Sequence, residues 1–231
     1  MNIAIIPARG GSKRIPRKNI KEFHGKPMIS YSIDAALNSG CFDKVIVSTD
    51  DPQIAEVAIK YGAEVPFMRP TNIADDYATT LDVIKHAIQF TEQQAWGIKN
   101  VCCIYATAPF LTPEFIQRGL QELTENGINY VFSATSFPFP IQRAIKLNAE
   151  RRVEMFQPEH LNTRSQDLEE AYHDAGQFYW GTASAFIKGK SMFTSQSKAI
   201  LLPRACVQDI DTIDDWQYAE LLFSASNKLK K

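Results

Sequence analysis

The feature that most constrains the fold is a regular alternation of short apolar runs with longer amphipathic segments over the first 136 residues. Each apolar run has the length of a buried strand, and each amphipathic segment has the spacing of a helix packed on one face. The expected strands are residues 3–7, 44–48, 64–68, 101–105 and 130–136. Strands that alternate with helices in this way form a largely parallel sheet with right-handed crossovers. The sequence therefore predicts an α/β fold.

Local signals place the ends of the helices. The first expected helix covers residues 28–39 and stops at Gly40, a favourable C-terminal residue. Asp51 and Pro52 have the residue types of an N-cap and a first helical position, so a second helix begins there and ends at Gly62. Further helices are expected over residues 79–94, from Thr112 to about Gly127, and from Thr212, with Asp215 as a capping-box partner.

The alternation of expected strands and helices stops after residue 136. The segment from about 137 to 178 is irregular and polar and contains Pro138, Pro140 and Pro158, so we interpret it as an inserted arm or subdomain. Residues 177–187 are expected to be extended, and residues 204–210 are expected to form the last strand. The chain is thus predicted to be a single domain, residues 1–231, with an arm inserted at about 137–178.

The charge balance and the cysteines exclude several classes of function. With 25 basic and 26 acidic residues the net charge is -1, which argues against a nucleic-acid or membrane-surface binder. The sequence contains no apolar run of membrane-spanning length, and its first residues are not expected to act as a signal peptide, because the apolar stretch precedes the charges. Cys102 and Cys103 are adjacent and would point to opposite sides of a strand, and the four cysteines show no CxxC spacing. Buried thiols and a cytoplasmic location are therefore expected.

The first loop, residues 8–19, leaves the first strand at the sheet edge where α/β folds bind ligands. Gly10 and Gly11 allow the backbone to approach a ligand, and successive N–H groups in such a turn form an anion-binding nest. Arg9, Lys13 and Lys18 add the charge that a polyphosphate needs. The alternative is a solvated basic loop. The motifs GxxxxGK[ST] and GxGxxG are absent, which disfavours a Walker P-loop and a dinucleotide dehydrogenase.

In addition to the basic loop, an acidic motif lies near the C-terminal end of the sequence. Asp209 and Asp211 are two residues apart and would share one side of the expected last strand. Paired carboxylates that face phosphates suit Mg²⁺, which prefers one or two carboxylates together with phosphate and water oxygens. Asp211 could instead orient the turn into the helix that starts at Thr212.

Several stretches of the sequence resemble one enzyme family. The opening stretch IIPARGGSKRIPRKN is similar to the signature of the CMP-sialate synthetase family, and matching pieces follow in order: VIVSTDD, RPTNIADDYATT, TAP, GQFY and DIDT. The resemblance covers nearly the whole chain. It implies a Rossmann-like three-layer sandwich, an arm used for homodimerisation, and the reaction of CTP with a sugar acid to give a CMP-sugar and pyrophosphate. Three other pieces, EVPFMRP, FPFPIQRA and DAGQFYWG, resemble the members of the family that activate pseudaminic acid for bacterial flagellin glycosylation.

The resemblance also implies roles for particular residues. Arg9 and Lys18 would hold the triphosphate and, with Asp211, make up the catalytic group, while Asn19 would read cytosine. The remaining nucleotide contacts would be Ala8, Gly10, Gly11, Ser12, Lys13, Arg69 and Thr80. For Arg69 the alternative is a loop salt bridge, and for Thr80 it is the N-terminal position of a helix. Asp209 and Asp211 would hold Mg²⁺.

The sugar contacts are expected on later segments. The candidates are Tyr105, Gln142, Arg143, Gln177, Phe178 and Tyr179. Arg143 suits a sugar carboxylate, with an arm-to-partner salt bridge as the alternative. Tyr105 stands where the sialate enzymes usually have Gln, which points away from N-acetylneuraminic acid. Activation of legionaminic, neuraminic or octulosonic acid, a glycosyltransferase, and a non-catalytic nucleotide binder are the competing functions.

Overall fold

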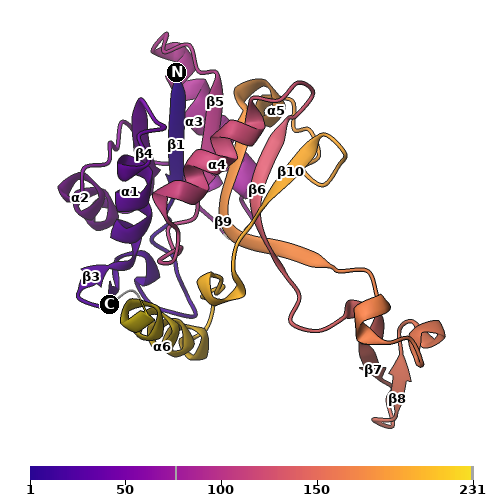
Figure 1. The fold of residues 1–231 in the computed structure, drawn as a ribbon. Helices are drawn as coiled ribbons and strands as arrows, with labels where there is room; N and C mark the ends of the chain where they lie inside the picture. Colours follow the sequence, from indigo (N-terminus) through magenta and orange to yellow (C-terminus); the bar gives the residue numbers. More distant parts are fainter. Residues whose placement is uncertain (76, 230–231) are drawn as a thin grey trace.

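The structure is a computed structural model that describes residues 1–75 and 77–229 (Figure 1). Its centre is a six-stranded sheet with the strand order β10-β6-β9-β5-β1-β4. The strands are β1 Asn2–Pro7, β4 Lys44–Ser48, β5 Asn100–Ile104, β6 Tyr130–Ser136, β9 Tyr172–Thr182 and β10 Ser197–Leu201. Only β9 runs antiparallel to its neighbours β5 and β6, so the predicted mostly parallel sheet is confirmed.

Helices cover both faces of the sheet and give the expected three-layer sandwich. The helices α1 Met28–Asn38, α2 Pro52–Lys60 and α4 Pro113–Leu123 pack on one face, and α3 Thr80–Gln93 and α5 Ala183–Ile187 pack on the other. Side chains of β1 alternate between the layers: Ala4 and Ile6 join the first core and Ile3 and Ile5 the second. Cys102 and Cys103 are divided between the two cores in the same way.

The cap signals in the sequence correspond to real hydrogen bonds. The Asp51 carboxylate accepts the backbone N–H groups of Gln53 and Ile54 at the start of α2, with Pro52 as the first helical residue. Thr79 and Asp82 form a reciprocal capping box that starts α3. Thr212 and Asp215 form a similar pair before α6, which spans Ile213–Leu229.

A third apolar cluster joins two segments that are distant in the sequence. Ile15 from the basic loop and Ile210 from the acidic motif are both fully buried in it. The cluster is completed by Phe23, Met28, Phe110, Trp216 and Ala219. Phe23 belongs to a small hairpin, β2 Glu22–Phe23 with β3 Lys26–Pro27, on which α6 packs (Figure 1). This packing brings the basic loop and the acidic motif together.

The predicted last strand at residues 204–210 is wrong. The segment begins with a 3-10 turn, η6 Arg204–Cys206, which follows Pro203, and continues without strand pairing to Thr212. The edge strand beside β6 is instead β10, which lies earlier in the chain than the predicted strand. The expected strand at 64–68 is reduced to two isolated bridges beside β4.

The arm leaves the body after β6 and returns with β9, as Figure 1 shows at the lower right. It carries a hairpin of β7 Ile145–Leu147 and β8 Val153–Met155 and three 3-10 turns, η3 Ile141–Arg143, η4 Pro158–His160 and η5 Ser165–Asp167. Residues 172–178, which the sequence analysis assigned to the arm, are already part of β9. Helix α5 also replaces the extended structure expected at 183–187.

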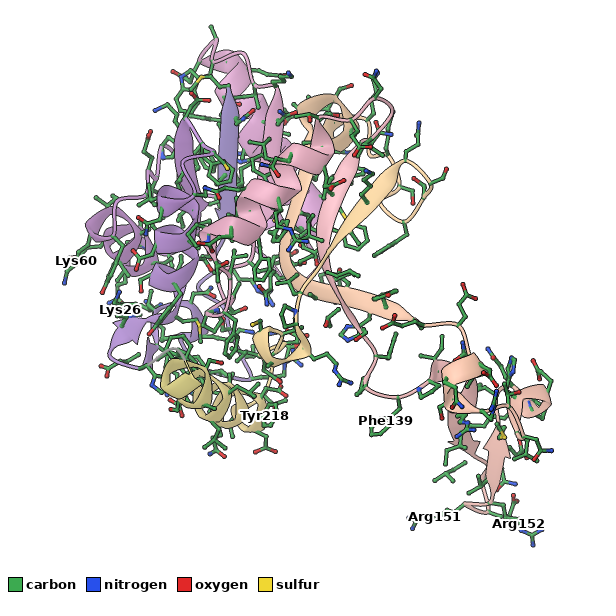
Figure 2. The ribbon with its side chains drawn as sticks, viewed as in Figure 1. Lys26, Lys60, Phe139, Arg151, Arg152 and Tyr218 are labelled. Atoms are coloured by element: carbon green, nitrogen blue, oxygen red, sulfur yellow. The ribbon has the colours of Figure 1, made fainter. Side chains whose placement is uncertain are left out.

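Many apolar side chains of the arm face solvent. Phe139, near its base, is 78% exposed, while Arg151 and Arg152 mark its tip (Figure 2). The other exposed apolar residues of the arm are Phe137, Ile141, Ile145, Leu147, Val153, Phe156 and Leu161. In the part of the chain that the structure describes, no helix is both long enough and apolar enough to cross a membrane.

Candidate active site

A cavity of about 340 Å³ lies where β1 and β5 end at the carboxyl edge of the sheet. Five cationic side chains line it, namely Arg9, Lys13, Arg14, Lys18 and Arg69. The acidic side chains in its wall are Asp75 and Asp211. Ligands of open α/β sheets bind at this edge, and an excess of cations in a concave site attracts a polyanion. We call this the first cavity.

The basic loop is folded against the ends of neighbouring elements. The Gly10 N–H donates to the Asp50 carboxylate at 2.9 Å, and the Arg17 guanidinium pairs with Asp51. The side-chain amide of Asn19 is buried and donates to the Arg9 backbone oxygen at 3.0 Å. Asn19 also lines the first cavity, so its side chain lies where the sequence analysis placed a base-reading residue.

Arg69 is a buried cation in the wall of the first cavity. Arg69 is 6% exposed, and its guanidinium donates to the hydroxyl and the backbone oxygen of Ser48. Burial lowers the pKa of Arg69, Asp50 opposes that shift, and the positive charge of Arg9 adds to it. The salt bridge considered for Arg69 is not formed to any carboxylate in the described part of the chain. A buried guanidinium held by neutral groups retains its charge for a ligand.

The acidic motif meets the basic loop at Asp211. The carboxylate of Asp211 lies 2.9 Å from the Arg14 guanidinium and 3.3 Å from Lys18 Nζ, and Lys18 also donates to the Ile210 backbone oxygen. Asp209 lies outside the cavity wall. Partial burial raises the pKa of Asp209, the charge of Asp211 raises it further, and Lys18 opposes the shift. The two carboxylates therefore repel each other although they do not lie on a strand.

A second cavity, also about 340 Å³, adjoins the first and shares Thr80 and Tyr105 with it. Its wall is mainly apolar, with Leu81, Ile84, Tyr130, Phe186, Met192 and Phe193. The polar residues in it are Thr79, Thr80, Tyr105, Asp174, Tyr179 and Lys190. The Tyr179 hydroxyl donates to Asp174 at 2.7 Å. Burial and the neighbouring Tyr105 and Asp174 raise the pKa of Tyr179, which keeps its hydroxyl protonated.

The structure brings together most of the predicted nucleotide residues. Those that line the first cavity are Arg9, Ser12, Lys13, Lys18, Asn19, Arg69 and Thr80, together with the predicted metal ligand Asp211 and the predicted sugar contact Tyr105. Ala8, Gly10 and Gly11 belong to the loop but not to the cavity wall. Thr80 has both of the roles considered for it, because it is the first residue of α3 and also lines the cavity.

The predicted sugar residues are divided between three places. Tyr105 and Tyr179 line the second cavity. Gln177 is buried and donates to the Cys206 backbone oxygen, and Phe178 is fully buried in the core beneath α4, so neither reaches a cavity wall. Gln142 and Arg143 lie on the arm and donate to backbone oxygens of the arm itself.

Sequence reasoning missed four charged residues of the two cavities. Arg14 and Asp75 line the first cavity, and Asp174 and Lys190 line the second. Arg14, Asp75 and Asp174 could have been found, because each lies inside a quoted motif. Lys190 carries no local signal, since only the tertiary fold brings it to the second cavity.

Comparisons with known proteins show the family of the chain. Residues 3–206 match the family model described as Cytidylyltransferase. Pseudaminic acid cytidylyltransferase from Campylobacter jejuni is 49% identical over 98% of each chain, and the CMP-N,N'-diacetyllegionaminic acid synthase of Legionella pneumophila is 32% identical over 98% of this chain and 97% of its own. The solved structure of CMP:2-keto-3-deoxy-manno-octonic acid synthetase with CTP covers 97% of this chain and 99% of its own, with a TM-score of 0.70 and 16% identity, and shows that the fold is shared.

The buried cation at Arg69 gives a first prediction. Arg69→Met should weaken the binding of inorganic tripolyphosphate, measured by isothermal titration calorimetry, by at least about tenfold, because one charge-assisted contact is lost. The free energy of unfolding should not fall, because a buried cation held by neutral groups costs stability. The exposed Arg118→Met on α4 is the matched control and should change neither quantity. Unchanged tripolyphosphate affinity in Arg69→Met would contradict the role of Arg69 as a polyphosphate-binding cation of the first cavity.

Proposed function

Because this chain belongs to the cytidylyltransferase family, it is a nucleotidyltransferase, and we propose that it transfers CMP from CTP to pseudaminic acid with release of pyrophosphate. The observation that carries the choice of sugar is the 49% identity to a pseudaminic acid cytidylyltransferase along the full length of both chains. The similarity to the legionaminic acid enzyme is lower, at 32%. The two adjoining cavities supply room for a nucleotide and for an acid sugar.

We place CTP in the first cavity. Its cations suit a triphosphate, and the buried Asn19 amide offers a donor and an acceptor of the kind that a cytosine edge requires. Arg9 and Lys18 enter the cavity from the loop and are the residues we assign to the departing pyrophosphate. Their charges would stabilise the negative charge that develops on the leaving group as the bond to the α-phosphorus breaks.

We propose that the acidic motif holds a divalent cation. The charge of Asp211 raises the pKa of Asp209, and Asp211 lines the first cavity, where phosphate oxygens would complete the coordination. Mg²⁺ bound by these two residues would neutralise phosphate charge and lower the pKa of the attacking hydroxyl. Arg14 and Lys18, which pair with Asp211, also line the first cavity in which we place the phosphates.

The sugar acid is placed in the second cavity. Thr80 and Tyr105 stand between the two cavities, so a sugar in the second presents its anomeric hydroxyl to the first. Holding the hydroxyl in line with the α-phosphorus supplies most of the catalysis that such a transfer needs. The Tyr179 hydroxyl already donates to Asp174, which leaves the hydroxyl oxygen and the remaining lone pairs of the carboxylate to accept from hydroxyl and N–H groups of the sugar.

We further propose that two chains associate through their arms. A two-stranded hairpin is marginally stable alone, and the arm exposes apolar residues such as Leu147 and Val153 on its two strands. Gln142 and Arg143 do not reach the cavities of their own chain, so as sugar contacts they would serve the site of a second copy. The cytoplasm as the compartment and flagellin glycosylation as the pathway complete the proposal.

The direct test mixes the purified protein with CTP, Mg²⁺ and pseudaminic, legionaminic or N-acetylneuraminic acid, and measures pyrophosphate release and product mass. We expect turnover with pseudaminic acid that exceeds the others at least tenfold in kcat/KM. Turnover should disappear on chelation of Mg²⁺ and in the folded variant Asp209→Ala. Preferred turnover of another acid would overturn the choice of sugar, and no pyrophosphate with any acid would overturn the reaction.

The arm gives a separate prediction. The wild-type protein should sediment at twice the chain mass of 26.0 kDa, and Leu147→Asp should shift it toward that single mass. A carboxylate placed in an apolar interface lacks a partner and is costly to desolvate. Leu221→Asp on α6, where the leucine is also exposed, is the control and should leave the dimer intact. A monomeric wild-type protein, or equal effects of both variants, would contradict the arm interface.

A further inference from the structure

The two ends of the basic loop are fastened to one acidic dipeptide, Asp50-Asp51, which follows β4. At the start of the loop, the Gly10 N–H donates to Asp50 Oδ1 at 2.9 Å. At its end, both terminal nitrogens of Arg17 contact the Asp51 carboxylate, and one of them also donates to Gln53 Oε1 at 2.6 Å. The residues between these two attachments include Ser12, Lys13 and Arg14, which line the first cavity.

The attachment is tight on both sides. A Cβ added to Gly10 would lie 2.7 Å from Asp51 Oδ2, so the loop passes the carboxylate at a distance that only glycine permits. Arg17 has a φ of 57°, in the left-handed region that a residue with a side chain rarely adopts. The Asp51 side chain is only 16% exposed, and the hydrogen bonds from Arg17 are the main cause of its lowered pKa. The ion pair therefore holds the loop in a backbone conformation that is unfavourable by itself.

The negative charge of Asp51 needs an explanation beyond helix capping. Asn and Ser cap helices about as well as Asp, so the two N–H groups at the start of α2 do not require a carboxylate. Close to a cavity for a polyanion, an extra negative charge by itself weakens binding. Neither Asp51 nor Arg17 is among the described residues that line the first cavity. The negative charge of Asp51 instead binds the guanidinium of Arg17.

We propose that Asp51 and Arg17 are positioning residues that hold the basic loop in its CTP-binding conformation before CTP arrives. The inference rests on the proposed function, which places the triphosphate of CTP in the first cavity. A loop that is already ordered does not lose conformational freedom when the ligand binds, whereas a released loop does. Release of one or two residues would weaken CTP binding by about tenfold to a hundredfold.

The decisive variant is Asp51→Asn, because it separates charge from loop positioning. If electrostatics alone governed the site, removal of a negative charge would tighten CTP binding. Loss of the ion pair with Arg17 should instead raise the Kd for CTP, titrated calorimetrically without sugar acid, by about tenfold or more. The KM for CTP should rise in parallel, while the KM for the sugar acid should change less than about threefold.

Further variants exclude the alternative roles. Arg17→Gln should match Asp51→Asn, and the double variant should be no worse than either single variant, because both break one interaction. Arg17→Lys should restore CTP affinity only in part, since an ammonium cannot make the bidentate contact. Asp34→Asn on α1, whose carboxylate pairs with Lys26 at the surface, is the matched control and should leave CTP affinity unchanged.

Several outcomes would overturn the inference. They are tighter or unchanged CTP binding in Asp51→Asn, additive effects in the double variant, and equal increases in the KM values of both substrates. If Asp51→Asn does not fold, Asp51→Ser retains a helix cap and takes its place. Failure of the wild-type protein to bind CTP would instead overturn the proposed function, so the two failures are distinguishable.

Discussion

The constraint on which the rest of the structure depends is the gathering of like charges in one cavity. Five cations face the same space, and their mutual repulsion has to be offset. The Asp211 carboxylate pairs with Arg14 and Lys18. Backbone oxygens do much of this work: Asp75 accepts from Arg9, Ser48 from Arg69 and Ile210 from Lys18. Carbonyl groups orient a cation but leave its charge in place, so the cavity stays attractive to a polyphosphate.

These acceptors belong to segments that lie far apart in the sequence. The sheet order places β1 between β4 and β5, so the basic loop after β1 meets the turn after β4 on one side and the Tyr105–Thr107 turn on the other. The acidic motif arrives by a different route, because burial of Ile15 and Ile210 in one apolar cluster ties it to the loop. The site is thus a consequence of two packing arrangements, the central sheet and the cluster beneath α6.

The sequence predicts the parts of this arrangement that depend on local chemistry. The caps at Asp51 and Thr212, the alternating burial along β1, and the concentration of charge after β1 are all set by neighbouring residues. The errors fall where pairing is non-local. Residues 197–201 pair with the free edge of β6, and residues 204–210, which follow Pro203, begin with a 3-10 turn instead of a strand. Phe178 points into the core because the alternation of side chains along β9 places it beneath α4. Lys190, which lies outside every quoted motif, reaches the second cavity only through the tertiary fold.

The measurement that tests the central claim most directly follows an oxygen atom. CTP labelled with ¹⁸O at the bridge between its α- and β-phosphorus atoms would be turned over with pseudaminic acid, and the products would be examined by ³¹P nuclear magnetic resonance and mass spectrometry. Attack of the sugar hydroxyl on the α-phosphorus predicts that all of the label leaves in pyrophosphate and that the CMP-sugar carries none. Label retained in the nucleotide product, or a sugar product formed without pyrophosphate, would contradict the account.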